Sequence, residues 1–119
     1  RICALLSLFI AIGASFFCDD AGSQCATMYV GEICGHRRLS IKPNENIADL
    51  GDLEFDNVIQ SVVVTRDCAL LLYDQHLFKG NRRMLLGNLK DEQYYLLDSG
   101  MRGAASSARC KCNITTMEI

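Results

Sequence analysis

The stretch Tyr73-Asp-Gln-His-Leu-Phe-Lys-Gly80 decides the fold, because it places an aromatic residue near each end of a short loop and closes the loop with glycine. It directly follows an apolar run at residues 69–72, which is typical of a strand. Glycine at position 80 permits a positive φ angle or a close approach of two backbones. Aromatic pairs prefer offset or edge contacts, so Tyr73 and Phe78 are expected to pack on each other across a folded-back hairpin.

A second, altered copy of this stretch lies upstream, at Tyr29-Val-Gly-Glu-Ile-Cys-Gly35. The two tyrosines are 44 residues apart and the two glycines are 45 apart, and each glycine precedes an Arg-Arg pair by the same step. The first copy is one residue shorter and carries Cys34 where the second carries Phe78. Farther along, Ser61 corresponds to Ser107. A repeat present twice predicts two similar halves of one domain rather than a solenoid, which needs more copies.

The pair of motifs resembles the βγ-crystallin superfamily, whose unit is a Greek key with Tyr-x4-Phe-x-Gly in its first hairpin and a serine-containing box before its last strand. The resemblance covers roughly residues 25–112, with motif one at about 25–66 and motif two at about 67–112 of a domain taken as 18–119. It implies an all-β fold, a two-sheet antiparallel sandwich of two Greek key motifs.

Short apolar and β-branched runs between turn residues predict eight strands, which suits this fold. The run at 60–65 is rich in valine and is predicted to be a buried strand. Residues 42–46 are predicted to be a loop, and a short strand is expected within 50–55. The remaining strands are expected at 26–31, 37–41, 69–73, 82–86, 93–97 and 106–112.

The length is that of one domain, and the first residues indicate secretion. Residues 1–17 join one arginine to a long apolar run with small residues near its end, which predicts a secretory signal peptide; the run is shorter than the ~20 residues of a membrane helix. An uncleaved anchor or a core strand is the alternative. The net charge of −2 becomes −3 when Arg1 leaves with the signal. This acidic charge argues against a basic surface for nucleic acid. Once the signal is removed, no membrane span is expected in the mature chain.

Six of the seven cysteines follow the predicted signal peptide and are expected to pair in an oxidising compartment. They are Cys18, Cys25, Cys34, Cys68, Cys110 and Cys112. Cleavage beyond Cys18 would leave one odd thiol, and the pairing itself stays open. The spacing Cys110-Lys-Cys112 also allows two sulfurs on one strand face to ligate zinc. No second pair of this type is present, and secretion favours disulfides.

The resemblance also implies a place for calcium. Calcium-binding members carry an acidic or Asn pair, two variable residues, Ser or Thr, and then Ser. Motif one has this box at Asp56-Asn-Val-Ile-Gln-Ser61, and motif two has Arg102-Gly-Ala-Ala-Ser-Ser107 in its place. In the family each site joins the acid of one box to the hydroxyl of the other. This rule leaves one such pairing here, between Asp56 and Ser106.

One calcium site is therefore expected, with oxygen ligands from both motifs, as calcium prefers. The expected ligands are the side chains of Asp56 and Ser106 and groups near Asn57, Val58 and Asp74. The other pairing would place Arg102 beside Gln60, where a guanidinium repels a dication. The alternative is an ordinary turn at 56–57, with serines that bond the backbone locally.

No catalytic pattern is present in the sequence. His36 and His76 lie near the hairpins and are interpreted as solvated surface groups, and there is no nucleophile elbow, metalloprotease helix or phosphate loop. The prediction is a secreted, non-enzymatic, disulfide-stabilised protein with a binding or structural role, calcium as its one cofactor, and an extracellular partner that could include a second copy of the chain. The sequon at 113–115 is a candidate glycosylation site.

The alternative is a secreted effector on the same fold, such as an antimicrobial or toxin-like protein or a protease inhibitor. An exposed apolar or basic patch would favour the membrane-active form, and a rigid protruding loop would favour the inhibitor. The acidic mature chain argues against a cationic membrane-active protein.

Overall fold

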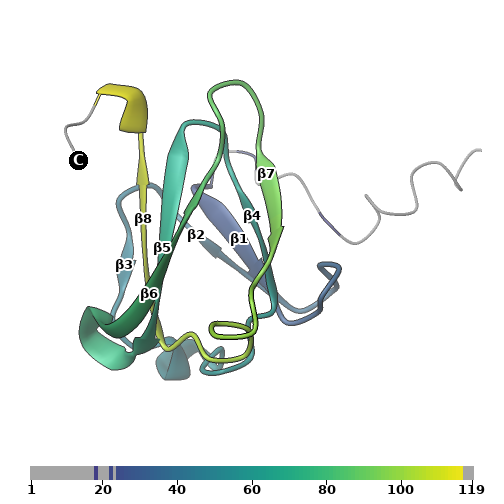
Figure 1. The fold of residues 1–119 in the computed structure, drawn as a ribbon, viewed down its shortest axis with the longest axis vertical. Helices are drawn as coiled ribbons and strands as arrows, with labels where there is room; N and C mark the ends of the chain where they lie inside the picture. Colours follow the sequence, from purple (N-terminus) through teal and green to yellow (C-terminus); the bar gives the residue numbers. More distant parts are fainter. Residues whose placement is uncertain (1–17, 19–21, 23, 117–119) are drawn as a thin grey trace, which may run out of the picture.

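Two four-stranded antiparallel sheets form the protein in a computed structural model that describes residues 18, 22 and 24–116. One sheet has the strand order β2-β1-β4-β7 and the other β3-β8-β5-β6, and they pack face to face (Figure 1). The strands are β1 Ala26–Tyr29, β2 Arg38–Ile41, β3 Asn46–Ile47, β4 Ser61–Val64, β5 Cys68–Gln75, β6 Lys79–Leu86, β7 Gln93–Leu96 and β8 Ser107–Cys112. The predicted all-β sandwich is confirmed, and the signal peptide predicted at 1–17 lies outside the described residues.

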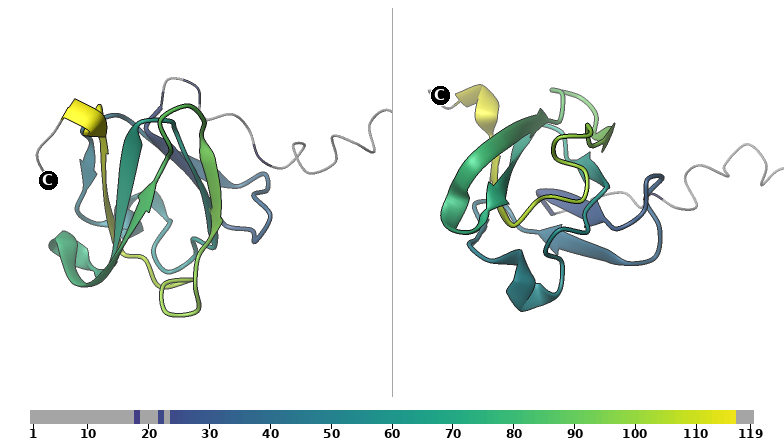
Figure 2. Two further views of the ribbon diagram at one scale, coloured as in Figure 1. Left: turned by 45° about the horizontal axis from the view of Figure 1, so that its top comes forward. Right: turned by 60° about the horizontal axis from the view of Figure 1, so that its bottom comes forward.

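The two halves exchange one strand each. Motif one supplies β1, β2 and β4 to the first sheet but sends β3 to the edge of the second; motif two supplies β5, β6 and β8 to the second sheet but sends β7 to the edge of the first. Figure 2 shows this from two further directions, with β7 beside β4 and β3 beside β8. The exchange makes the halves interdependent, because neither sheet is complete without a strand from the other motif.

Strand register confirms most of the predicted repeat. Tyr29 lies opposite Ser61 in the β1–β4 pair, and Tyr73 lies opposite Ser107 in the β5–β8 pair. The predicted equivalence of the two hairpin glycines is wrong by one position. Tyr29 faces Arg38 and Tyr73 faces Arg82, so both hairpins span the same number of residues and the first is not shorter. Only the glycine has moved within the loop.

The core lies between the sheets and follows from the alternation of side chains along each strand. In β5, Leu70 and Leu72 point inward and are fully buried. The largest buried side chains are Met28, Tyr29, Ile41, Leu50, Ile59, Leu70, Leu72, Leu97 and Met101. Strand β4 is buried on both faces, since Val62 and Val64 face the core while Val63 packs with Tyr29 and Cys34 on the outer face. This double burial explains its run of valines.

The strand expected within residues 50–55 is not formed. The segment is a 3-10 helix, η2 Leu50–Leu53, whose first turn is capped by Asp49 Oδ1 accepting from the Gly51 amide at 2.8 Å. Only Leu50 of this turn is buried, so no alternating face exists to pair with a sheet. The third strand is β3 instead, which begins at the last residue of the predicted loop and pairs with β8 at the sheet edge. Two further 3-10 turns are η3 His76–Phe78 and η4 Ile114–Thr116.

Three disulfides use the six cysteines that the sequence singled out. Cys18–Cys34 joins the N-terminal segment to the first hairpin, Cys25–Cys110 joins the two sheets, and Cys68–Cys112 joins neighbouring strands β5 and β8. Among the described residues, no helix is long and apolar enough to cross a membrane.

Candidate metal centre

In each motif, the side chain of one serine forms two hydrogen bonds that link the folded-back hairpin to the strand beside it; we call this pair of bonds the serine tie. Ser107 Oγ donates to the Gln75 carbonyl at 2.7 Å and accepts from the Phe78 amide at 3.0 Å. In motif one, Ser61 Oγ donates to the Gly31 carbonyl at 2.5 Å and accepts from the Cys34 amide at 3.1 Å. Gly31 and Gln75 each lie two residues after the repeat tyrosine, so the two ties are equivalent.

The second hairpin carries the expected aromatic pair. The rings of Tyr73 and Phe78 meet edge to face, with centroids 5.8 Å apart and planes at 74°. Gly80 has a φ of +83°, and a Cβ there would lie 2.1 Å from Asp74 Oδ1. Glycine therefore allows the Asp74 carboxylate to approach the chain and accept from the amide of Asn81 at 2.9 Å.

The two boxes at the starts of β4 and β8 lie side by side and are joined by backbone hydrogen bonds. The Asn57 amide donates to the Ala105 carbonyl at 2.9 Å, and the Gly103 amide donates to the Ile59 carbonyl at 2.9 Å. Asn57 and Gly103 both take the left-handed conformation, with φ of 60° and 71°. These reciprocal bonds hold each box beside its counterpart.

A cavity of about 450 Å³ opens between the first box, the second hairpin and the residue before β8. Its lining residues are Asp56, Asn57, Asp74, Gln75, His76, Leu77, Lys79 and Ser106. Four of the five predicted metal-site residues lie on this cavity. Val58 does not; it packs against the hydrophobic core.

The oxygens on this cavity suit a hard cation. Asp56 Oδ1 is buried from solvent and has no hydrogen-bond donor, and burying an unpaired carboxylate oxygen costs free energy unless a cation or donor meets it. Asn57 Oδ1 lies 3.3 Å from Ser106 Oγ, so an amide oxygen and a hydroxyl converge beside the carboxylate. Calcium prefers such a set of carboxylate, amide and hydroxyl oxygens, and the residues present fit it.

His76 and Asp49 belong to this site, although the sequence did not indicate it. His76 Nε2 lies 3.3 Å from Asp49 Oδ1 and 3.6 Å from Asp56 Oδ1. The second distance allows electrostatic attraction but is too long for a hydrogen bond, which agrees with the unpartnered Asp56 oxygen. The signal that was missed is the position of His76, three residues after the repeat tyrosine and thus on the hairpin that faces the box.

The equivalent place in the other half holds an acidic and a basic residue in exchanged positions. Arg102 stands where motif one has Asp56, and Glu32 stands three residues after its tyrosine, where motif two has His76. Arg102 Nη1 lies 3.4 Å from Glu32 Oε2, and its Nε donates to the Leu97 carbonyl at 2.9 Å. A side-chain cation therefore occupies the place in this half that is equivalent to the candidate metal centre.

Comparison with known proteins gives matches among solved structures. No family model matches the sequence, and a search of curated proteins gives no match. A domain from work on the evolution of the eye lens βγ-crystallin fold superposes with a TM-score of 0.67 at 14% identity, over 79% of this chain and 92% of that one. The fold is that of a βγ-crystallin domain.

Two other solved structures agree. The N-terminal domain of protein S superposes with a TM-score of 0.62 at 20% identity, over 73% of this chain and 94% of the other. A βγ-crystallin domain from Flavobacterium johnsoniae superposes with a TM-score of 0.61 at 20% identity, over 77% of this chain and 99% of the other. At these identities the similarity concerns the fold, and the chemistry must be inferred from this chain's own residues.

Proposed function

We propose that the protein is an extracellular, non-enzymatic βγ-crystallin-fold domain that binds one calcium ion and serves a binding or structural role. The observation that carries the proposal is the buried Oδ1 of Asp56, which accepts no hydrogen bond and lies beside the converging oxygens of Asn57 and Ser106. Asp56 supplies the charged ligand, and Ser106 supplies a hydroxyl from the other motif. The carbonyls of the 74–75 segment complete the set.

Calcium would act here as a stabiliser of the fold. Its ligands come from the first box, the second hairpin and the end of the second box, so one ion would join three segments that are distant in sequence. A ligand that binds only the native state stabilises it by RT ln(1 + [L]/Kd). At a calcium concentration tenfold above Kd, this amounts to about 1.4 kcal/mol. Even a weak site contributes where calcium is millimolar.

An extracellular location is supported by the covalent structure. Three disulfides in a domain of this size are typical of oxidising compartments. Asn113, the acceptor of the sequon, is exposed, so it would be accessible to glycosylation. The net charge gives no support for binding nucleic acid.

Calorimetric calcium titration of the oxidised protein tests the proposal, together with melting curves in calcium and in chelator. We expect one ion per chain and a higher melting temperature in calcium. Asp56→Asn keeps the shape of the side chain but removes its charge, and it should abolish both effects. Asp52→Asn is the matched control, because Asp52 is an exposed acid of η2 that does not line the cavity. It should bind calcium as the unmodified protein does.

His76→Ala adds a second measurement. The ring faces the Asp56 carboxylate at 3.6 Å, and calcium must displace it to reach that oxygen. The variant should therefore bind calcium more tightly, by a few-fold. A melting temperature that does not respond to millimolar calcium would refute the proposal, and two equivalent ions per chain would refute the assignment of a single site.

A secreted protease inhibitor is the second candidate function, and one observation favours it. Ile33 is 64% exposed at the tip of the first hairpin, next to Cys34, whose disulfide to Cys18 anchors the loop. A rigid loop with an exposed apolar residue suits a protease cleft, because little conformational entropy is lost on binding. Inhibition assays against endoproteases with different specificities would test this, with Ile33→Asp as the variant that should lose inhibition.

A further inference from the structure

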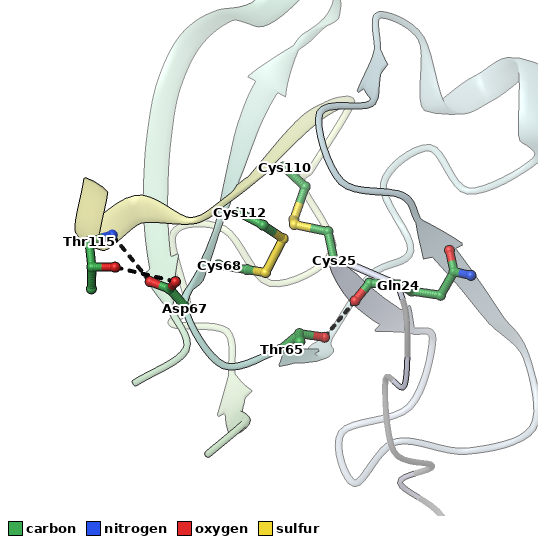
Figure 3. The surroundings of a disulfide bond; sticks show 8 residues. All are labelled: Gln24, Cys25, Thr65, Asp67, Cys68, Cys110, Cys112 and Thr115. Carbon is green, nitrogen blue, oxygen red and sulfur yellow. Dashed lines mark hydrogen bonds between the residues drawn. A yellow bond between two sulfur atoms is a disulfide. The ribbon is translucent and has the colours of Figure 1, made fainter. Parts of the chain in front are cut away.

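Two disulfides lie against each other at the end of the sandwich opposite the candidate metal centre. Cys25, just before β1, is bonded to Cys110 of β8, and Cys68, at the start of β5, is bonded to Cys112 at the end of β8. Figure 3 shows the two sulfur–sulfur bonds side by side. The sulfur atoms of Cys25, Cys68 and Cys112 all lie within 4.8 Å of one another. A sulfur of each bond is thus close to the other bond.

Backbone hydrogen bonds hold Cys25 and Cys68 together independently of the sulfur chemistry. The Thr65 amide donates to the Cys25 carbonyl at 3.0 Å, and the Cys68 amide donates to the Thr65 carbonyl at 3.2 Å. Thr65 Oγ1 also donates to the Gln24 carbonyl at 2.6 Å (Figure 3). Because these bonds do not depend on either disulfide, the two cysteines should stay close if one disulfide opens.

The four cysteines differ in their access to solvent. Cys25 and Cys110 are completely buried, and Cys68 is 2% exposed, but Cys112 is only half-buried. The turn after Cys112 is held to the start of β5, where the Thr115 amide donates to Asp67 Oδ1 at 3.2 Å. Cys112 is therefore the residue of the group that is most accessible to an external thiolate.

We propose that Cys112, Cys68, Cys25 and Cys110 form a thiol–disulfide exchange site that accepts low-molecular-weight thiols. In the first step, an external thiolate attacks the Cys112 sulfur. The new bond joins the external sulfur to Cys112, the Cys68–Cys112 bond breaks, and Cys68 leaves as a thiolate. Attack at the more accessible residue, Cys112, thus generates a nucleophile at the buried Cys68.

In the second step, the Cys68 thiolate attacks the Cys25 sulfur within the same cluster. A Cys25–Cys68 disulfide forms, the Cys25–Cys110 bond breaks, and Cys110 leaves as a thiolate. One thiolate and two disulfides enter the sequence, and one thiolate and two disulfides remain, so no oxidant is required. The new disulfide still joins β1 to the second sheet. The sandwich should therefore keep its covalent link while it carries the thiol on Cys112.

The third disulfide serves as an internal reference. Cys18–Cys34 lies on the outer face of the first sheet beside Tyr29 and Val63. In the described part of the chain, the one close group of metal- or thiol-type ligand atoms contains neither of its sulfurs. If an external thiol opens this bond, no neighbouring disulfide can accept the released thiolate. Opening should produce an adduct and a free thiol there, without a new cross-link.

A trapping experiment on the native, fully oxidised protein tests the proposal. The protein is exposed briefly to reduced glutathione at pH 8, its free thiols are trapped with N-ethylmaleimide, and its peptides are mapped by mass spectrometry. We expect glutathione on Cys112, a new Cys25–Cys68 cross-link and maleimide on Cys110. A first adduct on Cys25, Cys68 or Cys110 would overturn it. So would the absence of any adduct, or a glutathione adduct on Cys112 with maleimide on Cys68 and the Cys25–Cys110 bond intact.

Two variants separate the steps. The double variant Cys25→Ser/Cys110→Ser removes the acceptor disulfide, so glutathione on Cys112 should be accompanied by maleimide on Cys68. The matched double variant Cys18→Ser/Cys34→Ser removes the reference disulfide and should leave the Cys25–Cys68 exchange unchanged; a loss of exchange in that variant would contradict the site as assigned. The map of the unmodified protein decides the proposal even if the first variant does not fold.

Discussion

The two hairpins of this domain share one backbone framework and differ in what holds them. In both, a buried serine bonds a carbonyl and an amide of the folded loop, and the amide belongs to the residue five positions after the repeat tyrosine. In motif two that residue is Phe78, which packs edge to face on Tyr73. In motif one it is Cys34, which packs beside Tyr29 and is bonded to Cys18.

The comparison separates what the fold requires from what it tolerates. The serine tie is present in both halves because it satisfies backbone groups inside the hairpin, and a buried polar group without a partner costs about 1–3 kcal/mol. The packing partner varies, because an aromatic ring and a disulfide can both cover the tyrosine. The acidic and basic residues near the boxes even exchange positions, with Asp56 and His76 in one place and Arg102 and Glu32 in the other.

Of the changes that test this comparison, removal of the Cys18–Cys34 disulfide should lower the free energy of unfolding most. It closes a sequence separation of 16 residues, for which chain entropy predicts a loss of about 3 kcal/mol in the free energy of unfolding. Urea unfolding of Cys18→Ser/Cys34→Ser measures this loss. Amide exchange should rise more in the first hairpin than at Phe78. The same rise in both hairpins would show that the disulfide does not replace the aromatic pair.

Removal of the serine ties should have the next largest effect, and it should be similar in the two halves. Ser61→Ala and Ser107→Ala each remove one donor and one acceptor at a completely buried position. Each should lower the free energy of unfolding by about 1–3 kcal/mol. Ser99→Ala, in an exposed turn, is the control and should change it by less than about 0.5 kcal/mol. A loss confined to one half would contradict the equivalence of the two ties.

The sequence predicted what depends on repeated side chains and missed what depends on tertiary context. The tyrosines, the serines and the valine-rich strand were identified from their pattern, because a hairpin tie and a buried strand need those residue types locally. Strand β3 was missed because it is only two residues long, Asn46–Ile47, and forms through pairing with β8. The segment after it was expected to be a strand, but the Asp49 cap favours a 3-10 turn.

The candidate site was partly predictable for the same reason. Asp56, Asn57 and Ser106 were expected because their boxes resemble the calcium-binding pattern of the βγ-crystallin superfamily. His76 was interpreted as a solvated group because its neighbours Asp49 and Asp56 come from a distant segment of the chain. The one-position error in the hairpin glycines has a related cause, since strand register rather than glycine spacing defines the repeat.

Reversal of the charge at Arg102 tests the comparison of the two boxes. Its expected effect on stability is smaller than that of the disulfide and serine substitutions. Arg102→Asp restores an acid and removes the cation that faces Glu32 at 3.4 Å. If the proposed calcium site is correct, a second ion should bind, more weakly than the first because Gln60 offers no hydroxyl. The second variant Arg102→Asp/Gln60→Ser should bind it more tightly.

Titration calorimetry gives the number of ions for each variant. In Arg102→Asp/Asp56→Asn, one ion should bind, at the second site between position 102 and Gln60, which separates the two sites. A stoichiometry that stays at one in Arg102→Asp would show that the halves differ by more than this charge.

Loss of the ion pair between Arg83 and Asp98 should have the smallest effect on stability. This pair has no equivalent at the matching position of the first half. Arg83 Nε donates to Asp98 Oδ2 at 2.7 Å, whereas register places Leu39 at the equivalent position of β2. The hydrogen bond from Arg83 holds the pKa of the Asp98 carboxyl below its ordinary value, and the nearby amides of Gly100 and Met101 act in the same direction.

A lowered folded-state pKa means that this pair stabilises the protein above the unfolded pKa of about 3.9 and that the contribution is lost as pH falls through the folded value. Asp98→Asn keeps an acceptor for the Gly100 and Met101 amides but removes the charge. It should lower the melting temperature slightly at neutral pH and match the unmodified protein at the acid end, because there Asp98 is protonated anyway. Both side chains are exposed, so high salt should reduce the difference at neutral pH. Melting curves from pH 2 to 7 would show this convergence, and a difference that persists at the acid end would mean that Asp98 acts through the turn rather than through Arg83.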